Sequence, residues 1–318
     1  MNRGAASQPD PARRRILVVE PDAVLRNVLC NFLARDHHVD VVATADEART
    51  LLLSAPPYHL AMAELHLQPG TGIDFLAEAR RRSPATRAAI ITATRIDDYF
   101  ARLHPAGILN VFVRATPFNY DDFAVAVDNL LFPRRCMGLA RYLAQPCEIR
   151  TGRVRSHDSR RQVVDDAMAF FRRFRSYDTD INGLRLALEE IINNSIYHSF
   201  RLGDGTEKYR VGEFSHLDPS EDVTVEYGRD TRHLGFSVTD NQGTMDPAMV
   251  MKRIERQISM EGLYDMNGRG IFLTRNLSDR MVINIHPRVA TQVVLVFRHR
   301  TNAQPRPLHI NVIDDRTN

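Results

Sequence analysis

The sequence of 318 residues has few cysteines and lacks any long apolar run. Its three cysteines, Cys30, Cys136 and Cys147, are unevenly spaced, and this pattern fits neither a metal signature nor a disulfide framework. Such usage is typical of a reducing compartment. No apolar stretch approaches the roughly 20 residues that a membrane helix needs, and no apolar core of a signal peptide follows the basic N-terminus. We therefore predict a soluble cytoplasmic protein that makes no membrane contact.

Lysine is almost absent, since Lys208 and Lys252 are the only two among 42 basic residues. Genome base composition is the simplest explanation for this preference for arginine. The net charge of +3 is too balanced to indicate a nucleic-acid-binding protein. No segment has the character of a recognition helix, so we expect protein partners and no direct contact with nucleic acid. The length predicts two domains.

Residues 14–132 alternate short apolar runs with amphipathic segments. Strands are predicted at 15–19, 39–43, 58–63, 88–92 and 111–114, and helices at 24–34, 45–54, 72–82, 97–103 and 120–131. Five strand–helix units predict an open parallel sheet with helices on both faces, whose ligands bind at the carboxyl ends of the strands. Residues 1–13 are small and polar and are predicted to be a disordered tail.

The second half of the chain has a different pattern, which follows a predicted linker or connecting helix at 133–146. Strands are predicted at 147–154, 222–227, 233–239, 281–286 and 291–298, and helices at 160–175, at 181–200 and after residue 270. The order predicts an α+β domain with an antiparallel or mixed sheet. Residues 201–221 are expected to form a polar insertion, and 241–266 an irregular segment. In the tail at 301–318, residues 308–313 either add a strand or stay loose.

The strand order and the residues at the strand ends make residues 14–132 resemble a response-regulator receiver domain, which is flavodoxin-like with five parallel strands. Receivers hold Mg²⁺ with acidic residues after strand one, accept phosphate on an aspartate after strand three, and respond through a Thr or Ser and a Lys. The matching positions here are Glu20, Pro21, Glu64, Thr92 and Arg114. Proline supplies no carboxylate, and the longer Glu64 misplaces an attack that needs close alignment. We predict a degenerate receiver that is not phosphorylated by the usual route.

Three interpretations of this degenerate site stay open. Glu64 imitates a phosphorylated acceptor, or it is a solvated carboxylate in a domain that serves for docking and dimerisation. The second of these is the plainer interpretation. In the third, Glu64 or a neighbour is still an acceptor, and the receiver controls a kinase through phosphorylation.

The segment Leu186-Ala-Leu-Glu-Glu-Ile-Ile-Asn-Asn-Ser-Ile-Tyr-His198 predicts a helix with one apolar stripe. Glu190, Asn194 and His198 follow each other at intervals of four residues and therefore share a face. An amide oxygen can bind Mg²⁺, and a carboxylate one turn earlier can act as a general base. The helix is consistent with a metal–nucleotide site, although any surface helix also has a polar face.

Two further motifs strengthen this hypothesis. Asp240 ends a predicted strand three residues before Gly243. The sequence Asn-Gly-Arg-Gly at 267–270 opens a predicted helix, and glycines there let backbone N–H groups approach a phosphate. Thr291 begins the last predicted strand of this half.

In this order and spacing the motifs resemble those of the Bergerat-fold (GHKL) ATPases over residues 147–300, with an α+β sandwich fold. The similarity is greatest to the anti-sigma-factor serine/threonine kinases of bacterial partner switching. The resemblance implies ATP and Mg²⁺ as cofactors and a mobile lid at 244–266. It implies that Asn194 coordinates Mg²⁺ and that Glu190 takes the proton from a substrate hydroxyl. It also implies nucleotide contacts for the remaining motif residues, namely Asp240 at the adenine amino group, Gly243 and Thr291 beside it, and Gly268, Arg269 and Gly270 at the phosphates. Ala290 departs from the glycine that the family has at this position.

The resemblance implies a signalling regulator that phosphorylates a Ser or Thr of a STAS-domain anti-sigma-factor antagonist. A sigma factor and a PP2C-type phosphatase are the other expected partners, and a homodimer is the expected assembly. The alternative is a non-catalytic module that sequesters such a partner when ATP is bound. Residues 156–160 also resemble the phosphoacceptor box of a sensor histidine kinase. The 37 residues from His157 to Asn194 leave no room for the helical hairpin of that class.

Overall fold

The computed structural model describes residues 13–114, 118–174, 180–258, 269–298 and 307–314. Residues 1–12 of the predicted tail and Gly268 lie outside this part of the chain. Contacts divide the chain into two compact units, Met1–Thr92 with Pro105–Ile108 and Ala93–His104 with Leu109–Asn318. Residues 93–104 and 109–132 resemble a receiver in sequence but group with the second unit. The sequence places the boundary between the receiver-like and ATPase-like regions at 133–146, and this boundary stays a prediction.

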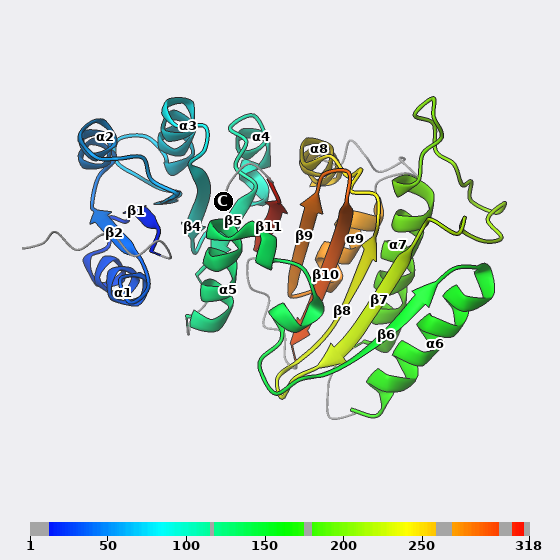
Figure 1. The fold of residues 1–318 in the computed structure, drawn as a ribbon. Coiled ribbons are helices and arrows are strands. Elements are labelled where there is room, and N and C mark those ends of the chain that lie inside the picture. The colour runs from blue at the N-terminus through cyan, green and yellow to red at the C-terminus, as the bar shows by residue number, and fades with distance from the viewer. Residues whose placement is uncertain (1–12, 115–117, 175–179, 259–268, 299–306, 315–318) are drawn as a thin grey trace, which may run out of the picture. The chain divides into compact units, whose positions relative to one another are not determined.

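The first unit contains a parallel sheet with the order β2-β1-β3-β4. Its strands are β1 (Arg15–Val19), β2 (His38–Val42), β3 (Leu60–Glu64) and β4 (Arg87–Thr92). Its helices are α1 (Ala23–Leu33), α2 (Ala45–Ser54) and α3 (Gly72–Arg82). Figure 1 shows α1 on one side of this sheet and α2 and α3 on the other. Asp22, Thr44 and Thr71 cap the three helices by accepting a backbone N–H, as their side chains predict.

The second unit contains a mixed sheet with the order β5-β11-β9-β10-β8-β7-β6. Its strands are β5 (Asn110–Val113), β6 (Glu148–Val154), β7 (Val223–Arg229), β8 (His233–Asp240), β9 (Arg280–His286), β10 (Ala290–Arg298) and β11 (Leu308–Val312). Its α-helices are α4 (Phe100–Leu103), α5 (Tyr120–Leu131), α6 (His157–Arg172), α7 (Ile181–Ser199), α8 (Pro247–Ile258) and α9 (Arg269–Leu277). Helix α7 packs against β7, β8, α6 and α9 (Figure 1). The predicted α+β pattern with a mixed sheet is confirmed.

The C-terminal residues 308–312 form strand β11, which resolves the open choice between strand and loose tail. β11 runs parallel to β9 and antiparallel to β5. Ile310 is 1% exposed, and its carbonyl accepts a hydrogen bond from Asn110 Nδ2 at 3.2 Å. Strand β11 thus lies between β5, from the first half of the sequence, and β9, from the second half, in one sheet.

Residues 133–146, predicted to be a linker or a connecting helix, pack against the sheet of the second unit. They form two short 3₁₀ turns, Pro133–Arg135 and Leu139–Tyr142. Leu139 is buried in a cluster with Val294 and other side chains of β9 and β10. Tyr142 Oη donates to the carbonyl of Cys136 and accepts from Asn284 Nδ2 at 2.9 Å. Buried polar groups of this kind require partners, and the network therefore fixes the segment on the sheet.

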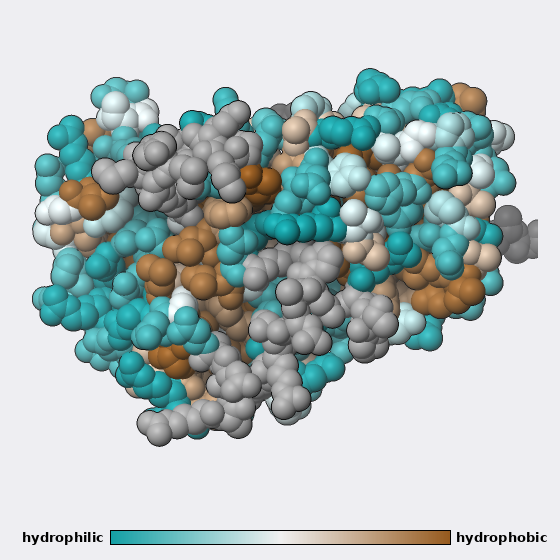
Figure 2. All heavy atoms as spheres, turned by 180° about the vertical axis from the view of Figure 1, so that it is seen from behind, coloured by the Kyte–Doolittle hydropathy of each residue, from teal (hydrophilic) through white to brown (hydrophobic). Residues whose placement is uncertain are grey.

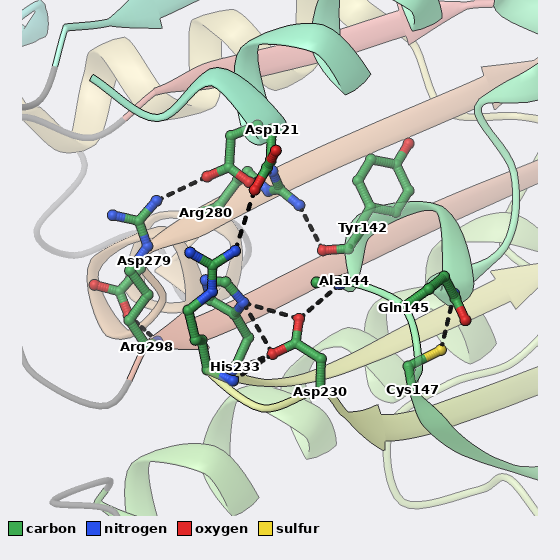
Figure 3. A network of polar contacts seen from close by, with 12 residues as sticks. Asp121, Tyr142, Ala144, Gln145, Cys147, Asp230, His233, Asp279, Arg280 and Arg298 are labelled. Carbon is green, nitrogen blue, oxygen red and sulfur yellow. Dashed lines mark hydrogen bonds and ion pairs between the residues drawn. The ribbon is translucent and has the colours of Figure 1, made fainter. Parts of the chain in front are cut away.

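Ion pairs attach the start of α5 to the same sheet (Figure 3). Asp122 binds Arg280 of β9, and its Oδ2 lies 2.7 Å from Arg298 Nη2 of β10. Burial acts to raise the pKa of Asp122, but the two arginines hold that pKa below its ordinary value. Close by, Asp230 accepts a backbone hydrogen bond from Ala144 at 2.7 Å. The start of α5 and the end of the segment that connects α5 to β6 are therefore both anchored.

The prediction of an irregular segment at 241–266 is wrong for residues 247–258, which form α8. Val250, Met251 and Ile254 are buried on one face of this helix. Residues 259–266 of the predicted lid lie outside the described part of the chain. None of the helices that the structure describes combines the length and apolarity needed to cross a membrane. The face drawn in Figure 2 is largely hydrophilic, with separate apolar groups between polar ones.

Candidate functional site

Three residues from two separate motifs meet where α7 contacts α9. Asp180 caps α7 by accepting the backbone N–H of Asn182 at 2.9 Å, and the helix then presents Glu190 and Asn194 one turn apart. Gly270 is the second residue of α9. A Cβ atom at Gly270 would lie 2.6 Å from Glu190 Oε2 and 3.3 Å from Asn194 Nδ2. The structure thus brings together the carboxylate, the amide and the glycine that the sequence singled out.

A buried polar atom at this contact has unused hydrogen-bonding capacity. Asn194 Nδ2 is buried without a hydrogen-bond partner among the described residues, and the carboxylate of the half-buried Glu190 lies at the same contact. Because buried polar groups are nearly always paired in native proteins, such atoms favour a polar ligand. The missing side chain at Gly270 leaves room for the Glu190 carboxylate and the Asn194 amide beside the start of α9, where a helix N-terminus favours an anion. This end of the site fits a phosphate group with its cation.

The other end of the site is a buried carboxylate. Asp240 ends β8 and is 2% exposed. Its Oδ2 accepts a hydrogen bond from Ser199 Oγ at 2.7 Å, and its Oδ1 accepts from the backbone N–H of Gln242 at 2.9 Å and of Gly243 at 3.2 Å. Burial raises the pKa of Asp240 above its ordinary value, although these hydrogen bonds oppose the shift. A fixed acceptor in such a place can recognise an amino group.

Gly243 and Thr291 flank this carboxylate as predicted. Gly243 has a φ of +61°, and a Cβ atom there would lie 2.1 Å from the carbonyl oxygen of His286, so the position requires glycine. Thr291 lies opposite Asp240 in the pairing of β10 with β8. Its Oγ1 is buried with no hydrogen-bond partner among the described residues. Asp240 and Thr291 together offer an acceptor and a hydroxyl to one ligand.

Sequence reasoning missed Ser199, which holds Asp240. Ser199 is the last residue of α7, and no spacing rule connects it with a carboxylate at the end of β8. His198 lies on the predicted face of α7, but its Nδ1 lies 2.8 Å from Oε1 of Glu207. It therefore bonds to the 201–221 insertion. The tertiary structure alone reveals these two contacts.

The remaining predicted site positions are partly described. Gly268 lies outside the described residues, Arg269 begins α9, and Ala290 begins β10. No group of three or more His, Cys, Asp or Glu in the described chain could hold a metal ion. A Mg²⁺ ion in a nucleotide site takes one or two protein ligands besides phosphates and waters. The donor set with Asn194 is therefore compatible with Mg²⁺.

Three residues of the predicted receiver site, Glu20, Glu64 and Thr92, are buried within the first unit. Glu20 is 1% exposed and accepts the backbone N–H of Asp22 at 3.0 Å, next to the exposed Pro21. Glu64 is 6% exposed, so its interpretation as a solvated carboxylate is wrong. Its Oε1 accepts from Thr92 Oγ1 at 2.8 Å, and from the N–H of the following residue at 2.8 Å. Arg114 follows β5, which belongs to the second unit.

The chain is similar to a family model and to curated proteins over parts of its length. Residues 156–297 match the family model described as the histidine kinase-like ATPase domain. The chain is 33% identical over 97 residues to protein-glutamate methylesterase/protein-glutamine glutaminase 4 of Anaeromyxobacter dehalogenans, a match covering 30% of this chain and 27% of that protein. It is 31% identical over 100 residues to the hydrogenase transcriptional regulatory protein HoxA of Cupriavidus necator, a match covering 31% of this chain and 20% of that protein. The chain thus spans about a quarter of these curated relatives.

Solved receiver structures are also similar to this chain. A signal receiver domain of an HD domain-containing protein from Pseudomonas fluorescens has 20% identity and a TM-score of 0.35, covering 40% of this chain and 93% of that one. A CheY-like receiver domain protein from Methanospirillum hungatei has 20% identity and a TM-score of 0.36, covering 40% and 99%. With the strand order of the first unit and the match at 156–297, the chain combines an N-terminal receiver fold with a histidine kinase-like ATPase domain. This combination suggests a regulator with ATP binding.

Proposed function

We propose that this chain binds Mg-ATP and phosphorylates a Ser or Thr of a STAS-domain anti-sigma-factor antagonist. The contact of Glu190 and Asn194 with Gly270 supports the proposal, since it brings a carboxylate and an amide close to a helix N-terminus. We assign the carboxylate as the base and the amide as the cation ligand. The buried acceptor Asp240 lies on a different element of the same domain and suits adenine. A nucleotide needs both features.

Each residue has a distinct role in this proposal. Asp240, oriented by Ser199, accepts the adenine amino group. Asn194 binds the cation, which supplies charge neutralisation at the phosphates. Glu190 accepts the proton from the substrate hydroxyl. The hydroxyl oxygen then bonds to the γ-phosphorus of ATP while the bond from that phosphorus to ADP breaks. Phosphoryl transfer depends mainly on positioning and electrostatics, so these few groups suffice.

The proposed pathway includes partners that the family resemblance implies. A sigma factor competes for the same protein, and a PP2C-type phosphatase reverses the modification. The protein acts as a homodimer in the cytoplasm. The receiver fold serves as a docking or regulatory domain, because Glu64 is buried and hydrogen-bonded where receivers have the acceptor aspartate.

Phosphotransfer to a purified STAS-domain protein tests the proposal. Full-length protein with Mg²⁺ and γ-labelled ATP should label the partner, and Glu190→Gln should abolish labelling while it retains ATP binding. Glu189→Gln is the matched control, since this neighbouring carboxylate pairs with Arg185 at 3.3 Å. Asn194→Ala should lose ATP binding. Partner binding that depends on ATP but is unchanged in Glu190→Gln, without any labelling, would support the sequestering module instead.

A further inference from the structure

Helix α9, which carries Gly270 of the candidate site, also carries a buried cation. Arg275 lies five residues after Gly270, about 7.5 Å farther along the helix axis. Its side chain is 3% exposed. Burial lowers the pKa of Arg275 below its ordinary value, and Asp97 acts in the opposite direction. A guanidinium in such a place needs a carboxylate nearby.

Asp97 supplies a carboxylate from a distant part of the sequence. Its Oδ1 lies 3.1 Å from Arg275 Nη1, and its Oδ2 lies 2.7 Å from Nε of the exposed Arg95. The guanidinium of Arg275 also faces the buried ring of Phe100, with 5.4 Å between its Cζ atom and the ring centroid. Asp97 and Phe100 both belong to residues 93–104, the segment that resembles a receiver yet groups with the ATPase domain.

The same segment contacts the helix that precedes the predicted lid. Helix α4 packs against α8, and His104 Nδ1 lies 3.8 Å from Glu255 Oε2 of α8. Helix α8 in turn packs against α9. The segment begins directly after Thr92, whose hydroxyl donates to Glu64. Residues 93–104 therefore connect the end of a receiver strand with both helices that flank residues 259–268.

We propose that Asp97 is a positioning residue for the ATP site, acting through Arg275 on the orientation of α9. The close packing of Gly270 against Glu190 and Asn194 depends on that orientation, since α9 is a short helix of 9 residues. A tilt at Arg275 is transmitted to Gly270 by the helix backbone. Nucleotide affinity thus depends on an ion pair within the second unit, between a segment that resembles a receiver in sequence and the helix that carries Gly270. This inference rests on the proposed ATP binding.

Two measurements on the full-length protein test the role of Asp97. The first is hydrogen exchange of residues 269–277 without nucleotide. Asp97→Asn should expose α9 to faster exchange, whereas Asp98→Asn, which changes the exposed neighbouring carboxylate, should not. The second is the Kd of a fluorescent ATP analogue at a temperature where circular dichroism shows each variant folded. Asp97→Asn should weaken binding about tenfold, Arg95→Gln should not, and Asp97→Glu should retain most of the affinity.

The outcomes separate this inference from the proposed function. If the unmodified protein fails to bind the analogue, ATP binding is refuted, and exchange at α9 still tests the Asp97 contact. If the unmodified protein binds and Asp97→Asn binds equally well with unchanged exchange at α9, the positioning role is refuted and ATP binding stands. A purely structural role would lower thermal stability and leave the Kd of the folded protein unchanged, which also overturns the inference.

Discussion

Replacing Gly270 by alanine should lower the turnover of this protein while leaving its thermal stability intact. Alanine is favoured over glycine within a helix by about 1 kcal/mol, so the change alone does not threaten α9. The added Cβ atom would lie 2.6 Å from Glu190 Oε2, which is closer than real Cβ contacts allow. The atom in its way is the flexible end of a side chain, so Glu190 can move at little cost.

The size of this movement sets the expected effect. The carboxylate must retreat by about 0.8 Å to reach an ordinary contact near 3.4 Å. A misplacement of about 1 Å at a reacting group can reduce a rate about 100-fold. Asn194 Nδ2, at 3.3 Å from the same Cβ position, needs a much smaller adjustment. We therefore expect turnover to fall by about two orders of magnitude, while ATP affinity changes less.

The assay compares thermal unfolding, binding of a fluorescent ATP analogue and turnover of γ-labelled ATP in Gly270→Ala and the unmodified protein. Gly203→Ala is the matched control, since nothing lies within 4 Å of a Cβ atom there. The melting temperature of Gly270→Ala should stay the same or rise. Unchanged turnover in a folded Gly270→Ala protein would refute the role given to the contact with Glu190.

Three further predictions concern other contacts. Ser199→Ala removes a hydrogen bond to the buried Asp240, worth about 1.5–3 kcal/mol, and should weaken ATP binding about tenfold. The loss should grow as the pH falls toward the raised pKa of Asp240, because the hydrogen bond from Ser199 acts to lower that pKa. Asp122→Asn should reduce the free energy of unfolding by about 2 kcal/mol at neutral pH, because it weakens the charged hydrogen bonds with Arg280 and Arg298. The arginine partners hold the pKa of Asp122 below its ordinary value, so the contribution of Asp122 to the free energy of unfolding is complete above about pH 4 and is lost as the pH falls through the depressed pKa. Urea unfolding at several pH values should therefore show the free energies of unfolding of the two proteins becoming equal in acid. Ile310→Ala, in a fully packed position, should cost about 2–5 kcal/mol, whereas Val24→Ala at a side chain 74% exposed should be nearly neutral in the same denaturation assay.

Elements with a strong local pattern were predictable from the sequence. Apolar runs predict the strands of the first unit, and helical spacing of apolar residues predicts the long helix α7. Helix α8 was also present in the pattern, because Val250, Met251 and Ile254 have helical spacing. The choice between strand and loose tail at β11 could not be made from the sequence, because a short apolar run becomes a strand only where a neighbouring strand offers an edge, and here β5 and β9 offer it.

The candidate site was predictable where each residue belongs to a motif with its own chemistry. Glu190 and Asn194 share a helix face, and Gly270 opens the next helix, so the structure had only to bring two motifs together. The supporting residues carry no such signal. Ser199 is a serine at the end of a helix, and its partner Asp240 lies 41 residues away in the sequence. Asp97 is one of many carboxylates, and its partner Arg275 also lies far away in the sequence. Tertiary packing alone gives them a role.

The part of the chain that resembles a receiver contributes to the packing of the ATPase domain. Asp97 pairs with Arg275, Asp122 pairs with Arg280, and β5 pairs with β11, all within the second unit. A fragment limited to residues 147–300 would lose both carboxylates and would expose the edge of β9 that β11 covers. We expect this fragment to be less stable and to bind ATP more weakly than a fragment spanning 93–318. Equal melting temperatures and equal affinities of the two fragments for a fluorescent ATP analogue would show that the ATPase domain folds independently of these contacts.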